Sequence, residues 1–265
     1  MTGKFKSSLP PGQLAWLYPL LLILLCAGTA CEQAPLASPP PTQQVIRVVL
    51  PASLGPLQAG LQNCASDQPG IALFIEDPGS ADASAPDLAI SLGEAASPTG
   101  YAALLAVEDL VVVLNQANRL DSLTANSLHD LYTGQISKWD DLGNALGAVQ
   151  VWDYAVSDPL HHAFDKAVLK GSSVTSLAYI APSPADMLEA VSANPQAVGY
   201  MPHAWLSQKK VYAVDLDADT KTAFHFPVLA VAAHEPQGAL RTLVACLQTG
   251  KGHTFIMQHY QPANP

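Results

Sequence analysis

The stretch that decides the fold is Ser122 to Gly143, with the sequence SLTANSLHDLYTGQISKWDDLG. Within it, Thr124 is a residue type that commonly caps a helix at its N-terminus. Leu128 and Leu131 follow at helical spacing, and Gly134 is the residue type that most often ends a helix. The stretch therefore predicts a short helix with one apolar face.

On both sides of this helix, short apolar runs alternate along the chain with segments in which apolar residues recur at helical spacing. The expected strands are residues 45–50, 71–75, 87–90, 110–114, 149–154, 198–201, 211–214 and 226–232. The expected helices are residues 57–64, 159–170, 238–247 and 252–259, with a further helix capped by Ser183. Strands that alternate with helices are typical of parallel α/β packing, so we expect an α/β fold.

The composition supports a packed body and argues against nucleic-acid binding. Hydrophobic residues make up 49% of the 265 residues and charged residues 13%, which is ample material for a core. The formal net charge is -10, whereas phosphate backbones require clustered Lys and Arg. The longest basic run in the body is Lys209 and Lys210, which we interpret as a solvated turn.

The N-terminus has the features of an export signal. Lys4 and Lys6 precede an almost wholly apolar run at residues 14–27, and the segment ends in Gly28-Thr29-Ala30-Cys31. Small residues before a Cys resemble the bacterial lipobox, so we expect residues 1–30 to be a signal peptide and Cys31 to carry lipid. Two alternatives remain: a plain transmembrane anchor, for which the run is short of the usual ~20 residues, and a signal that is cut without lipidation.

The next segment, residues 31–44, is predicted to be an extended tether because it holds four prolines and no aromatic residue. The folded body then begins at Val45. With Cys26 in the signal and Cys31 carrying lipid, two cysteines remain, Cys64 and Cys246. In an exported protein such a pair favours a disulfide, and the alternative is two buried free thiols.

Several stretches, taken in order, resemble the phosphate-binding proteins of bacterial ABC importers, within the type II periplasmic-binding superfamily. The clearest is the stretch quoted first, where the family pattern is filled by Leu123, Thr124, Leu128, Leu131, Gly134, Ile136, Trp139 and Asp141. Residues 108–123 look like the strand and Asn hinge that precede that helix in the family. Residues 191–202, the pair Phe226-Pro227 and residues 249–252 resemble later family segments.

The resemblance implies two α/β lobes joined by two crossover strands. One lobe would comprise residues 45–114 plus 222–265, and the other residues 115–221. Cys64 and Cys246 would then lie in the same lobe, which favours a bridge between them. The tryptophans are expected to pack in the core or the hinge rather than to stack on a sugar; they are Trp139, Trp152 and Trp205.

In the family that the chain resembles, a tetrahedral oxyanion lies between the lobes and three loops hold it. The first loop here is residues 51–55, where Ser53 and Leu54 are the candidate contacts and Ser53 keeps the hydroxyl. The second loop has Ser91, but Leu92 stands where the family usually has Arg. Both loops therefore keep fewer polar groups than the resemblance implies.

The third loop departs furthest from the family pattern. Its matching positions are residues 158–161, in which Asp158 and His161 are the candidate ligand contacts. A carboxylate repels a phosphate dianion unless one of them is protonated, whereas a protonated His161 could assist an anion. We favour Asp158 as the N-cap of the following helix. His162 is adjacent to His161, so the two point to different helix faces and a shared metal site is not expected.

The sequence predicts a receptor rather than an enzyme, because no Gly-x-Ser-x-Gly elbow or metal signature is present. We expect a monomeric, lipid-anchored solute-binding protein at the extracytoplasmic face of a bacterial membrane, with an ABC permease as partner and no cofactor. Its ligand would be a small molecule or an inorganic anion, and phosphate is one candidate. The alternative is a divergent module without an oxyanion ligand, which serves as a sensor partner or surface protein.

Overall fold

The computed structural model describes residues 3, 43–78, 85–93, 100–208 and 210–263. The predicted signal peptide, Cys31 and nearly all of the predicted tether lie outside these residues. Within the described part of the chain, no helix combines the length and the apolar character needed to cross a membrane.

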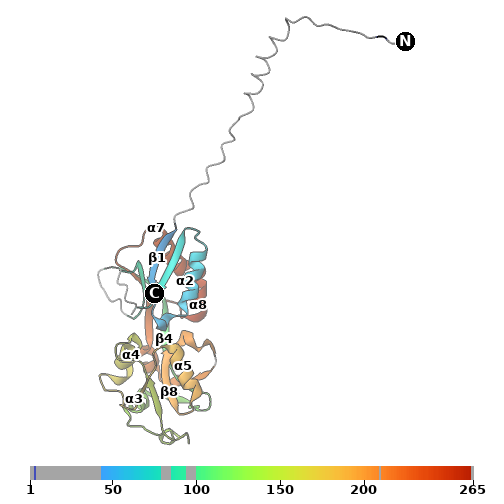
Figure 1. Ribbon diagram of the computed structural model, residues 1–265. Coiled ribbons are helices and arrows are strands. Elements are labelled where there is room, and N and C mark those ends of the chain that lie inside the picture. The colour runs from blue at the N-terminus through green and yellow to red at the C-terminus, as the bar shows by residue number, and fades with distance from the viewer. Residues whose placement is uncertain (1–2, 4–42, 79–84, 94–99, 209, 264–265) are drawn as a thin grey trace. The chain divides into compact units, whose positions relative to one another are not determined.

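The first lobe is built on one half of a long mixed sheet (Figure 1). Its strands, in spatial order, are β2 (Ile71–Glu76), β1 (Gln44–Val49), β3 (Leu88–Leu92), β11 (His225–Ala232) and the first part of β4 (Tyr101–Asn115). The helices that pack here are α2 (Leu57–Ser66), α7 (Gly238–Thr249) and α8 (Lys251–His259). Short η2 (Ala52–Leu54) follows β1.

The second lobe continues the same sheet from the last part of β4. Its strands are β8 (Ala197–Pro202), β6 (Gln150–Asp153) and β7 (Tyr179–Ile180), with β9 (Val211–Ala213) pairing β4, and β5 (Ser122–Leu123) pairing β10 (Asp215–Leu216). Its helices are α3 (Ala125–Thr133), α4 (Pro159–Phe164), α5 (Pro184–Ala193) and α6 (Ala218–Ala223). Its shorter helical segments are η3 (Trp139–Leu142), η4 (Asp165–Leu169), which continues α4, and η5 (His203–Gln208).

Strand β4 belongs to both lobes. Residues 101–109 pair with β11, and residues 110–114 pair with β8. The chain returns from the second lobe beside this point, where the Leu110 N–H donates to the Phe224 carbonyl oxygen at 3.0 Å. The two predicted crossover strands therefore lie next to each other and are hydrogen-bonded.

The apolar core is divided at these crossovers. One buried cluster draws on residues 46–106 and 228–260, joined by Ala204, and the other on residues 110–224. Residues 110–114 pair with β8, and Leu110, Val112, Val113 and Leu114 are buried in the second cluster. Leu92 contacts both clusters, so it marks the boundary between the lobes.

The helix that opened the sequence analysis forms as predicted. The Thr124 side chain accepts a hydrogen bond from the Ser127 N–H at 3.1 Å, which satisfies one of the free donors of the first turn. Gly134 ends the helix with a φ of 82°, a backbone conformation that glycine adopts without strain. The predicted cap of α5 is also confirmed, since Ser183 accepts from the Asp186 N–H.

Cys64 on α2 and Cys246 on α7 form a disulfide, with their Cα atoms 5.8 Å apart. The pair lies in the first lobe, where α8 crosses beside it. Gly252 makes this approach possible, because a Cβ at that position would collide with the Cys64 sulfur. The bridge therefore links two helices through cysteines that are 182 residues apart in the chain.

Replacing both cysteines, Cys64→Ser with Cys246→Ser, should lower the free energy of unfolding by about 2–5 kcal/mol, because the unfolded chain would regain the freedom of a long closed loop. Guanidinium titration followed by tryptophan fluorescence measures the change. The wild-type protein in excess reductant is the matched control and should unfold like the double variant. Equal stability of the oxidised wild type and the variant would contradict a stabilising role for the bridge.

Candidate functional site

A cavity of about 600 Å³ lies between the two lobes. Its walls come from the end of β3, from the exposed side of α4 and η4, and from the start of β11. The lining residues are Leu92, Gly93, Pro159, His162, Ala163, Lys166, Ala167, Ala223, His225, Phe226 and Pro227. Because both lobes and a crossover strand form this interlobe cavity, a molecule inside it would contact all three.

One wall of the interlobe cavity is a single helix face. His162 and Lys166 are four residues apart, as are Ala163 and Ala167, so each pair lies on adjacent turns. The alanines are short, which leaves space in front of the helix, while His162 and Lys166 are exposed and place basic groups beside that space. This wall is therefore both open and basic.

The other residues that line the cavity are mostly apolar. Leu92 ends β3, and Phe226 and Pro227 lie near the start of β11. His225 lies at one end, where its Nδ1 pairs with the Asp109 carboxylate on β4. From the second lobe, His162 and Lys166 are the basic residues among those that line the cavity.

The first predicted loop does not line the interlobe cavity. Ser53 and Leu54 lie in η2, where the Leu54 side chain is fully buried and its N–H donates to the Pro51 carbonyl oxygen. Trp205 from η5 packs against Gly55 and donates its indole N–H to the Ser53 carbonyl oxygen at 3.0 Å. This loop is thus used for packing near the hinge, as the sequence predicts for Trp205.

The second predicted contact, Ser91, lies inside β3 and pairs with Leu229 of β11. Its hydroxyl is buried and has no hydrogen-bond partner among the described residues. Leu92, one residue further on, is the side chain that lines the interlobe cavity. The strand therefore presents an apolar group where the resemblance implies Ser and Arg.

Asp158 caps α4, which confirms the favoured interpretation. Its Oδ1 accepts a hydrogen bond from the Leu160 N–H at 2.8 Å, and its carbonyl oxygen accepts from the His162 N–H. Burial raises the pKa of Asp158, and the hydrogen bond from Leu160 partly offsets that increase. The carboxylate is therefore engaged with its own helix.

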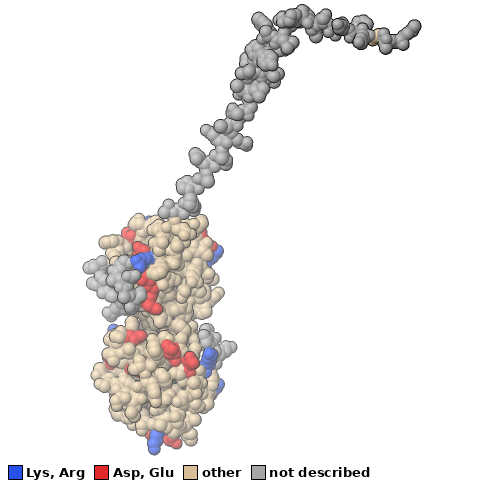
Figure 2. All heavy atoms as spheres, in the orientation of Figure 1, with Lys and Arg blue, Asp and Glu red and all other residues tan. Residues whose placement is uncertain are grey.

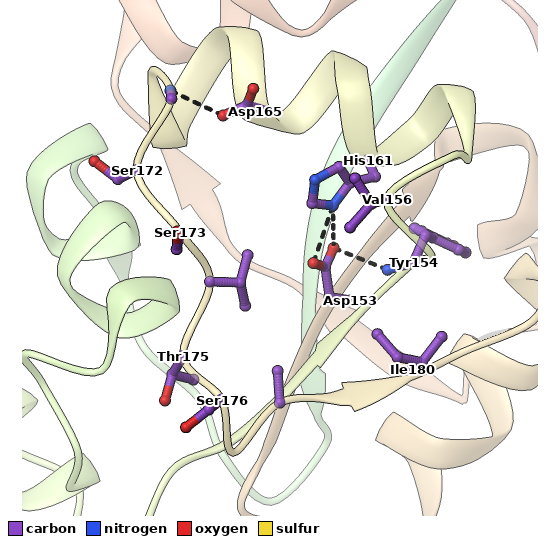
Figure 3. Close-up of a pocket in the computed structure, with 13 residues that line it drawn as sticks. Asp153, Tyr154, Val156, His161, Asp165, Ser172, Ser173, Thr175, Ser176 and Ile180 are labelled. Atoms are coloured by element: carbon purple, nitrogen blue, oxygen red, sulfur yellow. Dashed lines mark hydrogen bonds and ion pairs between the residues drawn. The ribbon is translucent and has the colours of Figure 1, made fainter.

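His161 lies in a different cavity, of about 440 Å³, formed by the second lobe alone (Figure 3). Its Nδ1 is 3.0 Å from Oδ2 of Asp153, a carboxylate that is only 3% exposed. The Tyr200 hydroxyl and the Tyr154 N–H both donate to Asp153, at 2.5 and 2.8 Å. Asp153 thus fixes the imidazole, and His161 and His162 face different cavities.

The wall opposite His161 is the segment of residues 171–178, which carries Ser172, Ser173, Thr175 and Ser176 (Figure 3). Ser172 is hydrogen-bonded to His129, and Thr175 accepts from the Leu177 N–H. The second ring nitrogen of His161 faces this wall (Figure 3). The cavity therefore places one oriented imidazole across from a Ser- and Thr-rich segment, and its lining residues all come from the second lobe.

Glu108 is a buried carboxyl at the crossover that the sequence analysis did not single out. It is 1% exposed, and its Oε1 accepts from the Asp109 and Ala204 N–H groups, while Oε2 has no partner among the described residues. Burial raises its pKa to about 8. The Tyr260 hydroxyl is likewise buried and unpaired there, and burial followed by repulsion from Glu108 raises its pKa.

The charge distribution at the surface and the placement of potential metal ligands bear on other kinds of site. On the face in Figure 2, Lys and Arg side chains are scattered and form no patch. Among the described residues, no group of three or more His, Cys, Asp and Glu side chains is placed to hold a metal ion.

Sequence reasoning missed His162, Lys166 and Leu92 as lining residues of one cavity. The four-residue spacing of His162 and Lys166, and of the two alanines beside them, was visible as one helix face. The packing of α4 on the sheet decides which helix face points toward the other lobe. The spacing alone therefore could not show whether His161 or His162 lines the interlobe cavity.

Comparison with known proteins identifies the fold. No protein-family model and no curated protein matches the chain. Solved structures do match, including a putative phosphate ABC transporter substrate-binding protein with bound phosphate from Clostridium perfringens. It has a TM-score of 0.74 and 18% identity, over 83% of this chain and 100% of that one.

Two other solved structures show the range of proteins with this fold. The substrate-binding domain of a putative molybdenum ABC transporter from Clostridium difficile has a TM-score of 0.53 at 16% identity, over 83% of this chain and 99% of that one. The regulatory domain of a LysR family regulator from N. meningitidis has a TM-score of 0.56 at 12% identity, over 83% and 95%. The chain therefore has the two-lobed α/β fold of type II periplasmic binding proteins, and likenesses at this identity show the fold alone.

Replacing Asp158 with Ala should lower the free energy of unfolding by about 1 kcal/mol, because the N-terminus of α4 loses its cap. Asp158→Ser should stay within about 0.5 kcal/mol of the wild type, because Ser is an equally good cap. Urea titration measures both. If Asp158→Ser were as unstable as Asp158→Ala, the carboxylate would be needed for more than capping.

Glu108 should make the protein less stable as the pH rises. Between the ordinary pKa of 4.5 and the folded value of about 8, the folded state holds a proton that the unfolded state has released. The free energy of unfolding therefore falls across that window, by an amount on the order of several kcal/mol, and levels off above it.

Thermal and urea unfolding of Glu108→Gln between pH 5 and 9 measures this effect, because the amide keeps the side-chain volume and removes the titration. The wild type should lose stability relative to Glu108→Gln as the pH rises. Glu189→Gln, at an exposed position, is the control and should run parallel to the wild type. Parallel curves for Glu108→Gln and the wild type would contradict a titrating Glu108.

Proposed function

We propose that this protein is an exported, lipid-anchored solute-binding protein of an ABC importer, and that it binds a small anionic solute between its two lobes. The observation that carries this proposal is the interlobe cavity, because both lobes and a crossover strand line it. A solute that contacts both lobes stabilises the arrangement in which they close on it, and such hinge closure is how binding proteins signal occupancy.

The anchor and the permease rest on the order of segments in the sequence. A signal peptide at residues 1–30, lipid on Cys31, a proline-rich tether and a binding body form the layout of a receptor kept beside a membrane transporter. We accordingly propose an extracytoplasmic location, an ABC permease as partner, a monomeric state and no catalytic role.

The predicted domain boundaries, with lobes of residues 45–114 plus 222–265 and residues 115–221, stay part of this proposal. The division of the buried apolar residues into two clusters supports a two-lobed division close to these boundaries.

An inorganic oxyanion is one ligand class within the proposal, as the family resemblance implies. The alternative is a module without an oxyanion ligand, acting as a sensor partner or surface protein. Three observations favour that alternative: the packed first loop, the buried Ser91 hydroxyl and the engagement of Asp158 with its own helix. The two functions differ in whether any small solute closes the lobes.

A thermal-shift screen of the full chain in detergent tests the proposal, using phosphate, sulfate, molybdate and small organic anions. A ligand at 100 times its dissociation constant should add about 2.7 kcal/mol to the free energy of unfolding. Hydrogen exchange should then show protection in β3 of the first lobe and α4 of the second at the same time. Absence of any shift, or protection confined to one lobe, would contradict a solute receptor and leave the alternative.

A further inference from the structure

The cavity within the second lobe is a separate space that the proposed function does not use. Its volume is about 440 Å³, which falls in the range of pockets for small organic ligands, ~300–1,000 Å³. All of its lining residues come from the second lobe, and none of them lines the interlobe cavity. A ligand in this second-lobe cavity therefore leaves the space between the lobes free.

One wall of the second-lobe cavity is a helix face that presents a fixed imidazole. The His161 side chain is only 12% exposed, and its Nδ1 is held 3.0 Å from the buried carboxylate of Asp153. Its other ring nitrogen, Nε2, faces the cavity and has no hydrogen-bond partner within the described residues (Figure 3). An imidazole that is oriented from behind and unpaired in front is available to a ligand in the cavity.

The same helix face adds a carboxylate. Asp165 lies four residues after His161, so the two side chains lie on adjacent turns, and both line the cavity. Its Oδ1 accepts a hydrogen bond from the Gly171 N–H at 3.0 Å, whereas Oδ2 makes no hydrogen bond or ion pair within the described residues. Asp165 therefore keeps one oxygen available to a ligand.

The remaining polar groups of the lining leave the cavity negative. The wall opposite His161 carries four hydroxyls, of which those of Ser173 and Ser176 have no partner within the described residues. No Lys or Arg is among the lining residues, so two carboxylates are balanced by at most one positive charge, on His161. The lining is thus negative whether or not His161 is protonated. Carboxylates and hydroxyls both accept hydrogen bonds, so this lining favours a cation with several N–H donors.

Apolar side chains make up much of the rest of the lining. Val156 and Ile180 are 72% and 53% exposed although they line the cavity, and Val174 and Ala178 are half-buried. A ligand that covers these side chains removes apolar surface from water, which contributes favourably to binding. The cavity therefore matches a ligand with one positive end and a short apolar body.

Basic residues around the cavity do not neutralise Asp165. Lys166 lines the interlobe cavity instead. Lys170, at the end of η4, is exposed and forms no ion pair within the described residues. His129 is hydrogen-bonded to Ser172 from outside the cavity lining. None of these three is paired with Asp165, so a cationic ligand would displace no ion pair there.

We propose that the second-lobe cavity binds a small organic cation. Its ammonium group would lie between Asp165 and His161, and its apolar body would contact Val156, Val174 and Ile180. This site is distinct from the interlobe cavity and goes beyond the proposed solute-binding function, so the two proposals are tested separately.

Calorimetric titration of the full chain in detergent at pH 7.5 tests the proposal, with the detergent alone as blank. The probes are butylamine and benzylamine, the uncharged butanol and benzyl alcohol, and the anions butyrate and benzoate. The amines should bind at least about tenfold more tightly than the alcohols, because only the ammonium group pairs with Asp165. The anions should bind no better than the alcohols.

Two variants separate the charged from the apolar contact. Asp165→Asn removes the charge but keeps an acceptor for the Gly171 N–H, so it should weaken the amines about tenfold or more and leave the alcohols unchanged. Ile180→Ser should weaken amines and alcohols to the same degree. The matched control, Asp121→Asn, makes the same charge change at an exposed residue outside the cavity lining and should change neither.

Hydrogen exchange of the wild type with benzylamine locates the bound amine without any substitution. Protection should appear in residues 171–180 and leave β3 of the first lobe unchanged. Failure of both amines to bind, equal affinity for amine and alcohol, undiminished amine binding by Asp165→Asn, or protection of β3 would each overturn the proposal. None of these results changes the outcome of the anion screen, so the proposed solute-binding function is judged on its own.

Discussion

Strand β4 is the element on which the rest of the structure depends, because it is shared by the two lobes. Its first part pairs with β11 and its last part with β8, and the returning chain is hydrogen-bonded to it from Phe224 to Leu110. Backbone pairing of this kind resists stretching and sliding, so relative movement of the lobes has to occur as bending at the crossovers. The start of β11, which leaves the crossover, also lines the interlobe cavity. The crossover and the cavity therefore share a segment.

The crossover also holds two buried polar groups. Glu108 is almost fully buried, and within the described part of the chain neither its Oε2 nor the Tyr260 hydroxyl has a hydrogen-bond partner. Burying a carboxyl without a full set of partners costs free energy, and the carboxyl responds by keeping its proton. A proton on Glu108 therefore stabilises the folded protein relative to the unfolded chain.

The scaffold alone does not identify a ligand. The fold is shared with structures described as a putative phosphate ABC transporter substrate-binding protein, the substrate-binding domain of a putative molybdenum ABC transporter and the regulatory domain of a LysR family regulator. Selection of a ligand depends on the side chains that line the cavity, among them the apolar Leu92 and the exposed His162 and Lys166.

The sequence by itself determined the features that depend on neighbouring residues: the fold class, most helices and strands, and the caps at Thr124, Ser183 and Asp158. Helices, strands and caps depend on residues a few positions apart, so their patterns can be read directly from the sequence. The sequence did not reveal the first half of β4. Glu108 and Asp109 interrupt the apolar pattern there, and hydrogen-bonded pairing with β11 makes these residues part of the strand. Only the tertiary structure decided which face of α4 lines the cavity. The lining residues come from segments some 70 residues apart in the chain, such as Leu92 and His162, and local sequence patterns do not show which distant segments lie close together.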